Sequence, residues 1–208
     1  MSLLIYAESA DGKFKKVAFE LASYAKKIAD TIGSTVTAVT VNAGDVSELS
    51  KYGVSKVLKI KTDKLHDFNA KAYANCIKQV ALNENSTTIV LSSSTDSIYM
   101  APFIAIGLDA GFVSNVVELP IGYSPFQVKR TAFSNKAFNL TEMNTKIKIV
   151  SLSKNSYGLH ESHTAISEEE FIPVLNDTDF NVKVASVEKS TGKVTIADAD
   201  VVVSGGRG

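Results

Sequence analysis

Cysteine is almost absent from this chain, and its scarcity narrows the kinds of site the chain can carry. A single cysteine, Cys76, occurs among 208 residues. One thiol cannot build an internal disulfide framework, and metal sites made of cysteines need more than one. A disulfide-stabilised fold and a cysteine-based metal centre are therefore excluded.

Net charge and long apolar runs are missing as well. Lysine plus arginine and aspartate plus glutamate each number 22, so the formal net charge is zero and no basic footprint for nucleic acid is present. No apolar run approaches the roughly 20 residues that span a bilayer. The start, Met1–Glu8, lacks the basic and long apolar regions of a secretory signal. We expect a cytoplasmic chain that binds neither nucleic acid nor membrane.

The first part of the chain alternates between short apolar runs and segments of helical period. At about 150 residues per domain, its length corresponds to about 1.4 domains. Strands are predicted at Leu3–Ala7, Thr35–Val41, Lys56–Ile60, Thr87–Leu91 and Phe112–Val117, and helices at Phe14–Ile32, Val46–Tyr52, Asp67–Asn83 and Ile98–Ala110. This order predicts an α/β fold with a doubly wound, mostly parallel sheet, similar to Rossmann and adenine nucleotide alpha hydrolase folds.

The pattern changes after Pro120. Val128–Phe133, Lys136–Thr141 and Lys146–Leu152 are strand-like and separated by short turns. A parallel crossover needs a dozen residues or more, so these runs predict an antiparallel extension of the sheet.

The last third of the chain carries two weaker patterns. Ser167–Glu170 has the form of a capping box, and Pro173 limits the predicted helix to about one turn. Val182, Val184 and Val187 suggest one more strand.

The isolated reactive side chains do not form a recognisable catalytic group. His160 and His163 lie three residues apart in a polar, loop-like stretch without a third ligand, and His66 stands alone. Cys76 falls on the apolar face of a predicted helix, which favours packing because a reactive thiol needs a cationic neighbour or a helix N-terminus. Glu168, Glu169 and Glu170 are consecutive, so they fan out instead of converging as an acid/base pair.

Two loops fall at the sheet edge where open α/β folds bind ligands. Ser92–Asp96 follows a predicted strand and precedes a helix, so its hydroxyls and N–H groups can hold a phosphate or cap the helix. Glu8–Lys13 contains one glycine, Gly12, and lacks the glycine-rich dinucleotide fingerprint.

The end of the chain carries the most specific pattern. Val201–Val203 predicts a buried parallel strand, and Ser204, Gly205 and Gly206 form a turn that lets backbone approach a ligand. Arg207 would face an anion or an electron-rich ring. Such a turn should open onto a helix. We therefore expect residues 1–188 to form one α/β domain and residues 189–208 to be a linker and the first strand of a second, nucleotide-binding domain.

These terminal residues resemble the opening of the FAD-binding domain of electron transfer flavoprotein alpha subunits. Earlier segments resemble the same family in the same order along the chain. Leu4–Glu8 is similar to its first strand, and Tyr52–Val57 to its helix-to-strand junction. Pro102–Gly111 is similar to its helix entering the fifth strand, and Arg130–Ala137 to its hairpin. The family usually has glycine before the hairpin asparagine, where this chain has Ser134.

The resemblance implies the alpha subunit of an FAD-containing heterodimer. The family's complex takes electrons from flavin-dependent dehydrogenases and passes them to a quinone-linked oxidoreductase. Its alpha N-terminal domain is structural, packs on the beta subunit and holds no AMP, so no catalytic residue is expected here. Only Ser204, Gly205, Gly206 and Arg207 carry over as cofactor-binding positions. One alternative is an adenine-nucleotide-binding module, which rests on the α/β order and the Ser92–Asp96 loop. The other, a small hydrolase or transferase, rests on the fold alone.

Overall fold

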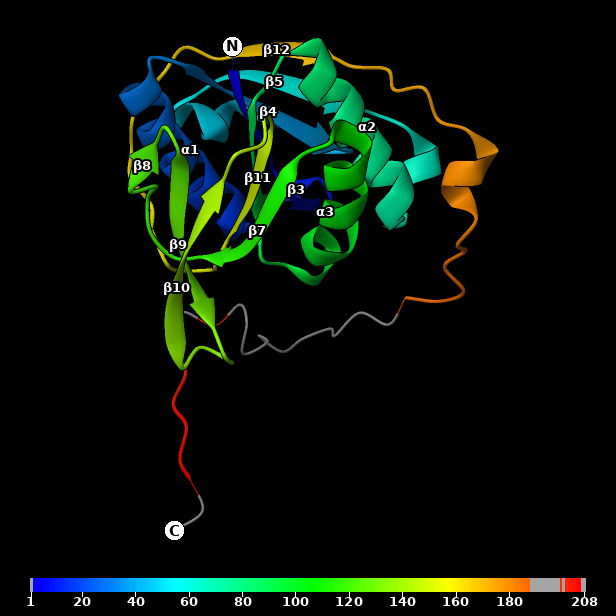
Figure 1. Cartoon of the computed structure of the whole chain (residues 1–208). Helices are drawn as coiled ribbons and strands as arrows, with labels where there is room; N and C mark the ends of the chain where they lie inside the picture. Colours follow the sequence, from blue (N-terminus) through cyan, green and yellow to red (C-terminus); the bar gives the residue numbers. More distant parts are fainter. Residues whose placement is uncertain (1, 188–198, 200, 207–208) are drawn as a thin grey trace.

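A central sheet organises this computed structural model, which describes residues 2–187, 199 and 201–206 (Figure 1). Within these residues, seven parallel strands follow the order β7 (Gly111–Val116), β11 (Lys148–Leu152), β6 (Thr88–Ser92), β1 (Ser2–Tyr6), β4 (Thr35–Val41), β5 (Val54–Ile60) and β12 (Ser167–Glu170). Beyond β7 the sheet continues antiparallel through β8 (Gly122–Tyr123), β9 (Phe126–Ala132) and β10 (Ala137–Met143). A separate hairpin joins β2 (Ser9–Ala10) to β3 (Lys13–Phe14).

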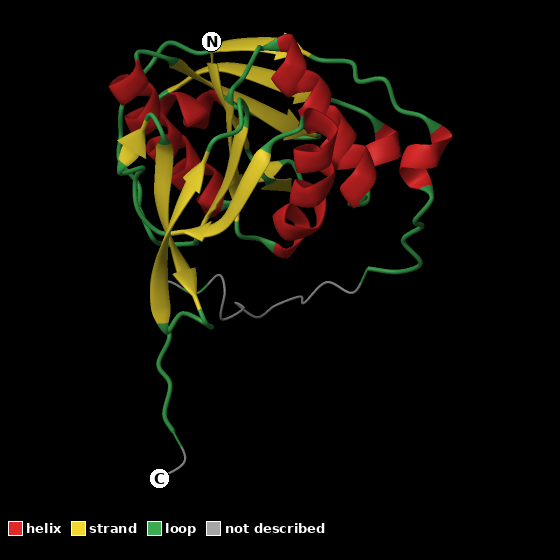
Figure 2. Ribbon diagram, viewed as in Figure 1, coloured by secondary structure: helices red, strands yellow, loops and turns green. Residues whose placement is uncertain are grey.

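Helices cover both faces of the sheet, which confirms the predicted doubly wound α/β fold (Figure 2). Leu3 and Ile5 of β1 pack with α1 (Lys16–Ile32). Leu4 and Tyr6 alternate with them and pack with α2 (Ala70–Asn83) and α3 (Thr95–Leu108). Both faces of β1 are buried, so neither face has to carry polar side chains. This explains why the sequence of β1 is a nearly continuous apolar run.

The helix boundaries follow their capping residues. Gly33 ends α1 in the left-handed region at φ 65°, with its N–H bonded to the Ala29 carbonyl. Ser94 caps α3 by accepting from the Ser97 N–H, so that helix starts at Thr95 and not at Ile98. Pro102 therefore lies inside α3. Proline has no N–H to bond to the carbonyl four residues earlier in the helix. It is tolerated here because Pro102 lies on the exposed face of α3, where water can bond to that carbonyl. The described residues also contain three short 3₁₀ helices: η1 (Ser47–Lys51), η2 (Asp63–Leu65) and η3 (Asp177–Phe180).

The prediction that Lys146–Leu152 pairs antiparallel was wrong. This run forms β11, which inserts between β6 and β7 and is parallel to both. A short connection favours antiparallel pairing only when the joined strands are neighbours, and here β9 and β7 separate β10 from β11. The predicted hairpin is confirmed in β9 and β10.

The predicted helical turn at Ser167–Glu170 was also wrong. These residues form the edge strand β12, parallel to β5. Glu168 pairs with Lys59 at 3.1 Å and Glu169 with Lys56 at 3.0 Å, so lysines of the neighbouring strand neutralise the run of glutamates. No strand forms over residues 181–187, contrary to the prediction for Val182, Val184 and Val187.

Residues 171–187, the α2 strap, run from β12 across α2 (Figure 1). Gln79 of α2 donates to the Val174 carbonyl and accepts from the Val174 N–H, both at 2.9 Å. Asn75 donates to Asp179 at 3.0 Å, and Asn69 donates to the Val182 carbonyl at 2.8 Å. Polar side chains of α2 and of its N-cap residue Asn69 therefore hold the strap through its backbone and through Asp179, which explains why no strand is needed there.

The hairpin of β9 and β10 projects from the sheet and carries exposed apolar side chains, including Phe133, Phe138 and Leu140 (Figure 1). Its turn places Phe133, Ser134 and Asn135 at φ 50°, 52° and 65°. Ser134 thus adopts the left-handed conformation for which the resembled family uses glycine.

Two isoleucines of α3 provide a matched test of this packing. Ile104 is fully buried, whereas Ile106 is 84% exposed. We expect Ile104→Ala to lower the free energy of unfolding by about 2 to 5 kcal/mol, because it leaves a cavity in the core. Ile106→Ala should change it by less than about 0.5 kcal/mol. Urea unfolding followed by circular dichroism measures both, and equal effects would contradict the assignment of the buried face.

Candidate functional site

The carboxyl ends of β1 and β6 meet at the point where the strand order reverses. β1 pairs with β4 on one side and with β6 on the other. Open α/β sheets bind ligands in the crevice at such a switch point. The predicted Ser92–Asp96 segment lies there, at the end of β6 and the start of α3.

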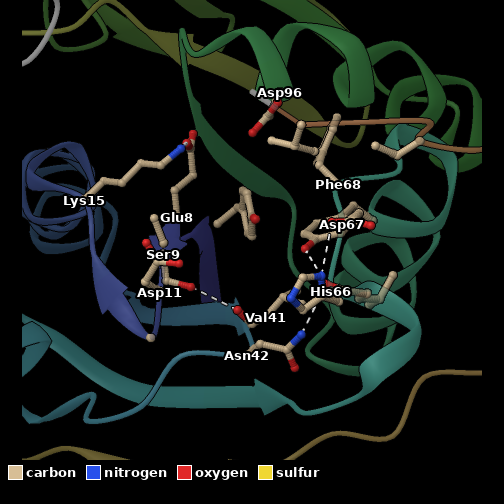
Figure 3. A pocket seen from close by; sticks show the side chains of 17 residues that line it. Glu8, Ser9, Asp11, Lys15, Val41, Asn42, His66, Asp67, Phe68 and Asp96 are labelled. Carbon is tan, nitrogen blue, oxygen red and sulfur yellow. Dashed lines mark hydrogen bonds and ion pairs between the residues drawn. The ribbon is translucent and has the colours of Figure 1, made fainter. Parts of the chain in front are cut away.

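A side chain of the protein itself occupies this crevice. Glu8, two residues beyond β1, is only 2% exposed. Its Oε1 accepts hydrogen bonds from the hydroxyls of Ser92, Ser94 (2.7 Å) and Ser97 (3.1 Å). Lys15 approaches Oε2 to 3.1 Å, as Figure 3 shows. A buried carboxylate is costly unless it is paired and hydrogen-bonded, and Glu8 is both.

The same serines hold the backbone at the start of α3. Ser94 Oγ accepts from the Ser97 N–H at 3.1 Å, and Ser92 Oγ accepts from the Ser94 N–H at 3.0 Å. The sequence predicted that this loop either holds a phosphate or caps the helix. Helix capping is confirmed for Ser94. Within the predicted loop the hydroxyls of Ser92 and Ser94 donate to Glu8, so the helix N-terminus already faces an internal anion.

A cavity of about 780 Å³ opens beside Glu8. Among the described residues, its lining carries four carboxylates, from Glu8, Asp11, Asp67 and Asp96, against the single ammonium of Lys15. Figure 3 shows Asp96 across the cavity from Lys15. Burial raises the pKa of Asp96, while Lys15 lowers it and Glu8 raises it further. This excess of negative charge opposes binding of a phosphate.

A smaller hollow of about 490 Å³ lies against Lys15, Lys16 and Lys154, with Glu8 and Asp96 also in its lining. Lys15 is paired with Glu8, and Lys16 and Lys154 also have partners. An anion would have to displace these contacts. This hollow is therefore the weaker candidate for a ligand site.

Sequence reasoning missed a second buried carboxylate, Glu20 of α1, which is 4% exposed. Its oxygens accept the backbone N–H groups of Asn155, Tyr157 and Gly158 at 2.9, 2.9 and 3.0 Å. Glu20 thereby fixes the loop after β11 onto α1. A signal existed in the sequence, because Glu20 falls between Val17 and Tyr24 at helical spacing on the buried side.

The remaining predicted candidates have structural surroundings. Cys76 is fully buried in α2, and burial raises the pKa of its thiol to about 12. The histidines have near neighbours: His66 Nδ1 lies 3.1 Å from Asp67, His163 Nε2 3.5 Å from Glu161, and the His160 ring contacts Tyr157. No group of three or more potential metal ligands is found in the described part of the chain. Nor does any helix there have the length and apolar character to cross a membrane.

The structure does not bring the predicted cofactor-binding residues to the crevice. Arg207 lies outside the described residues. Ser204, Gly205 and Gly206 are exposed, and none of them lines the cavity. The strand predicted at Val201–Val203 is not formed, and these valines are 80%, 52% and 93% exposed. Flavin binding by this segment stays a prediction.

Comparison with known proteins adds evidence independent of this geometry. The family model described as electron transfer flavoprotein domain matches residues 3–173. Electron transfer flavoprotein subunit alpha of Bacillus subtilis is 23% identical over 99% of the chain, and that of Megasphaera elsdenii is 27% identical over 99%. The acryloyl-CoA reductase electron transfer subunit beta of Anaerotignum propionicum is 23% identical over 98%. The chain covers 64%, 64% and 65% of the lengths of these three relatives.

Replacement of Glu8 tests the buried network. Glu8→Gln removes the charge and places an amide among three hydroxyl donors, so we expect a loss of about 2 to 4 kcal/mol in the free energy of unfolding. Glu161→Gln, at an exposed position, should change it by less than about 0.5 kcal/mol. Urea denaturation measures both variants. A Glu8→Gln variant as stable as the parent would show that the carboxylate does not organise the crevice.

Cys76 gives a second test. Because burial raises the pKa of the thiol to about 12, we expect it to react with Ellman's reagent at pH 8 far more slowly in the folded chain than in urea. In the folded chain the pKa of the Cys76 thiol lies above its usual value of 9.0. The stability that comes from burying the neutral thiol is therefore present below about pH 9 and is lost as the pH rises towards 12. An exposed thiol, Lys136→Cys in a Cys76→Ala background, serves as the control and should react rapidly. Equal rates in the folded state would contradict the buried position.

Proposed function

The chain belongs to the electron transfer flavoprotein domain family, and on that premise we propose that it is the N-terminal α/β domain of an electron transfer flavoprotein alpha subunit. The match covers the parallel sheet, the hairpin and the edge strand β12. Two of the relatives described above are named as alpha subunits. Each of them aligns with 99% of this chain.

The observation that supports a structural role for this domain is that its own side chain, Glu8, fills the crevice at the switch point. A cofactor diphosphate would need the N–H groups and hydroxyls at the start of α3. Three of the hydroxyls there, from Ser92, Ser94 and Ser97, donate to Glu8, the N–H groups of Ser94 and Ser97 bond to serine hydroxyls, and the adjoining cavity is acidic. The described residues of the α/β domain therefore do not fit FAD or AMP. The domain instead offers a rigid body against which other parts of a complex can pack.

We further propose that the complex is a heterodimer with an electron transfer flavoprotein beta subunit and that FAD binds outside the α/β domain. The relatives are longer than this chain, which leaves room for an FAD-binding domain joined through residues 189–208. Ser204, Gly205, Gly206 and Arg207 would supply its first cofactor contacts. When bound, FAD supplies reversible electron transfer.

The proposed complex is an electron carrier and not an enzyme. It accepts electrons from flavin-dependent dehydrogenases and delivers them to a quinone-linked oxidoreductase in the cytoplasm. The name of the Anaerotignum relative, an electron transfer subunit, supports this general role.

Calorimetry and absorbance spectroscopy on the purified 208-residue chain test the proposal. We expect a colourless protein that binds neither FAD, AMP nor ATP, and that forms a one-to-one complex with a coexpressed beta subunit from the same organism. A yellow chain with one tightly bound FAD would contradict the placement of the flavin elsewhere. Micromolar AMP or ATP binding that is lost in Ser94→Ala would favour the adenine-nucleotide module instead.

A further inference from the structure

The 780 Å³ cavity beside Glu8 is within the size range of cavities that hold small organic ligands. Most of its charged groups already have partners. Glu8 is bound by Lys15, Asp67 lies 3.1 Å from His66, and Asp11 also makes an interaction. These contacts leave Asp96 as the carboxylate to examine.

Asp96 has no hydrogen-bond or ion-pair partner within the described part of the chain. It lies in the first turn of α3, is partly buried and lines the cavity. Figure 3 shows its carboxylate directed into the open space. A half-buried carboxylate without a partner attracts a cation.

Tyr6 gives a second, independent observation. Its side chain is 94% buried (6% exposed), lines the cavity and packs edge-on against Tyr73. Its hydroxyl has no hydrogen-bond partner among the described residues. Within those residues, Thr40 Oγ1 is the buried polar side-chain atom that has neither a hydrogen-bond partner nor access to solvent. The Tyr6 hydroxyl also lacks a partner but does not belong to that class, so it retains access to solvent. Because Tyr6 lines the cavity, its hydroxyl is open to the cavity, where it can bond to a ligand.

Much of the remaining wall is apolar, although Ser9 and Asn42 also line the cavity. Val41, Leu65 and Phe68 contribute from the main body, and Val184 and Val187 close the cavity from the α2 strap. Such a wall suits a ligand with an apolar body. An aromatic ring at the wall also favours a cationic group.

We propose that this cavity binds a small organic amine, with its ammonium group on Asp96, a hydrogen bond to the Tyr6 hydroxyl and its apolar body against Phe68 and the strap valines. An anion is opposed by the four carboxylates of the lining. A bare metal ion is opposed because the described residues offer no cluster of three or more ligating side chains. This inference is independent of the proposed electron-transfer role.

Isothermal titration of the 208-residue chain with phenethylamine tests the proposal, with 2-phenylethanol and phenylacetate as neutral and anionic probes of similar shape. We expect saturable one-to-one binding of the amine at near-physiological salt. The alcohol should bind at least about tenfold more weakly, since it lacks a charge-assisted hydrogen bond. Phenylacetate should not bind.

Two variants and a matched control locate the site. Asp96→Asn should weaken amine binding at least about tenfold and leave the alcohol unaffected, whereas Asp67→Asn, whose carboxylate faces His66, should weaken it less than about threefold. Tyr6→Phe should weaken amine binding about threefold to tenfold at unchanged thermal stability. No saturable amine binding up to about 10 mM would overturn the proposal. So would equal losses in Asp96→Asn and Asp67→Asn, which would indicate attraction by the acidic surface alone.

Discussion

The hydrogen-bonded carboxylate of Glu8 is the interaction on which the arrangement of this domain depends. It connects the end of β1 to the end of β6 through Ser92, to the start of α3 through Ser94 and Ser97, and to the start of α1 through Lys15. Four elements therefore converge on one buried anion. Removing any partner would leave buried polar groups unsatisfied, which costs more than the contact itself contributes. The crevice that α/β folds commonly use for a ligand has become part of the core.

The same physical device recurs at Glu20, which fixes the loop after β11 to α1 through three backbone N–H groups. On the other face, side chains of α2 hold the α2 strap through the backbone of Val174 and the side chain of Asp179. Both contacts stabilise long connections that have little regular structure of their own. A body whose loops are fixed in this way suits a supporting role in a larger assembly, in keeping with the family to which the chain belongs. Among the described residues, the cavity beside Glu8 is lined by Asp96 and Tyr6, whose polar groups have no hydrogen-bond partner in that part of the chain.

Periodicity predicted the parallel core well, because β1, β4 and β6 are buried on both faces and leave no ambiguity of side. The failures fall where tertiary contacts override local pattern. The Ser167–Glu170 run becomes a strand because Lys56 and Lys59 of β5 pair with its glutamates. The position of β11 depends on which strands are neighbours, which turn length cannot reveal. The serines and the loop that begins at Glu8 were both placed at this sheet edge from their positions after strands. The hydrogen bonds between them were not predicted, since the three serines lie more than 80 residues from Glu8 in the sequence.

Glu8 closes the switch-point crevice to the phosphate groups of a cofactor. A crystal structure of the chain in complex with the proposed beta subunit, grown with FAD and AMP present, tests this closure. We expect the Glu8 carboxylate to remain within hydrogen-bond distance of the Ser94 and Ser97 hydroxyls and no phosphate to lie at the start of α3. A phosphate bound there, with Glu8 displaced, would contradict it.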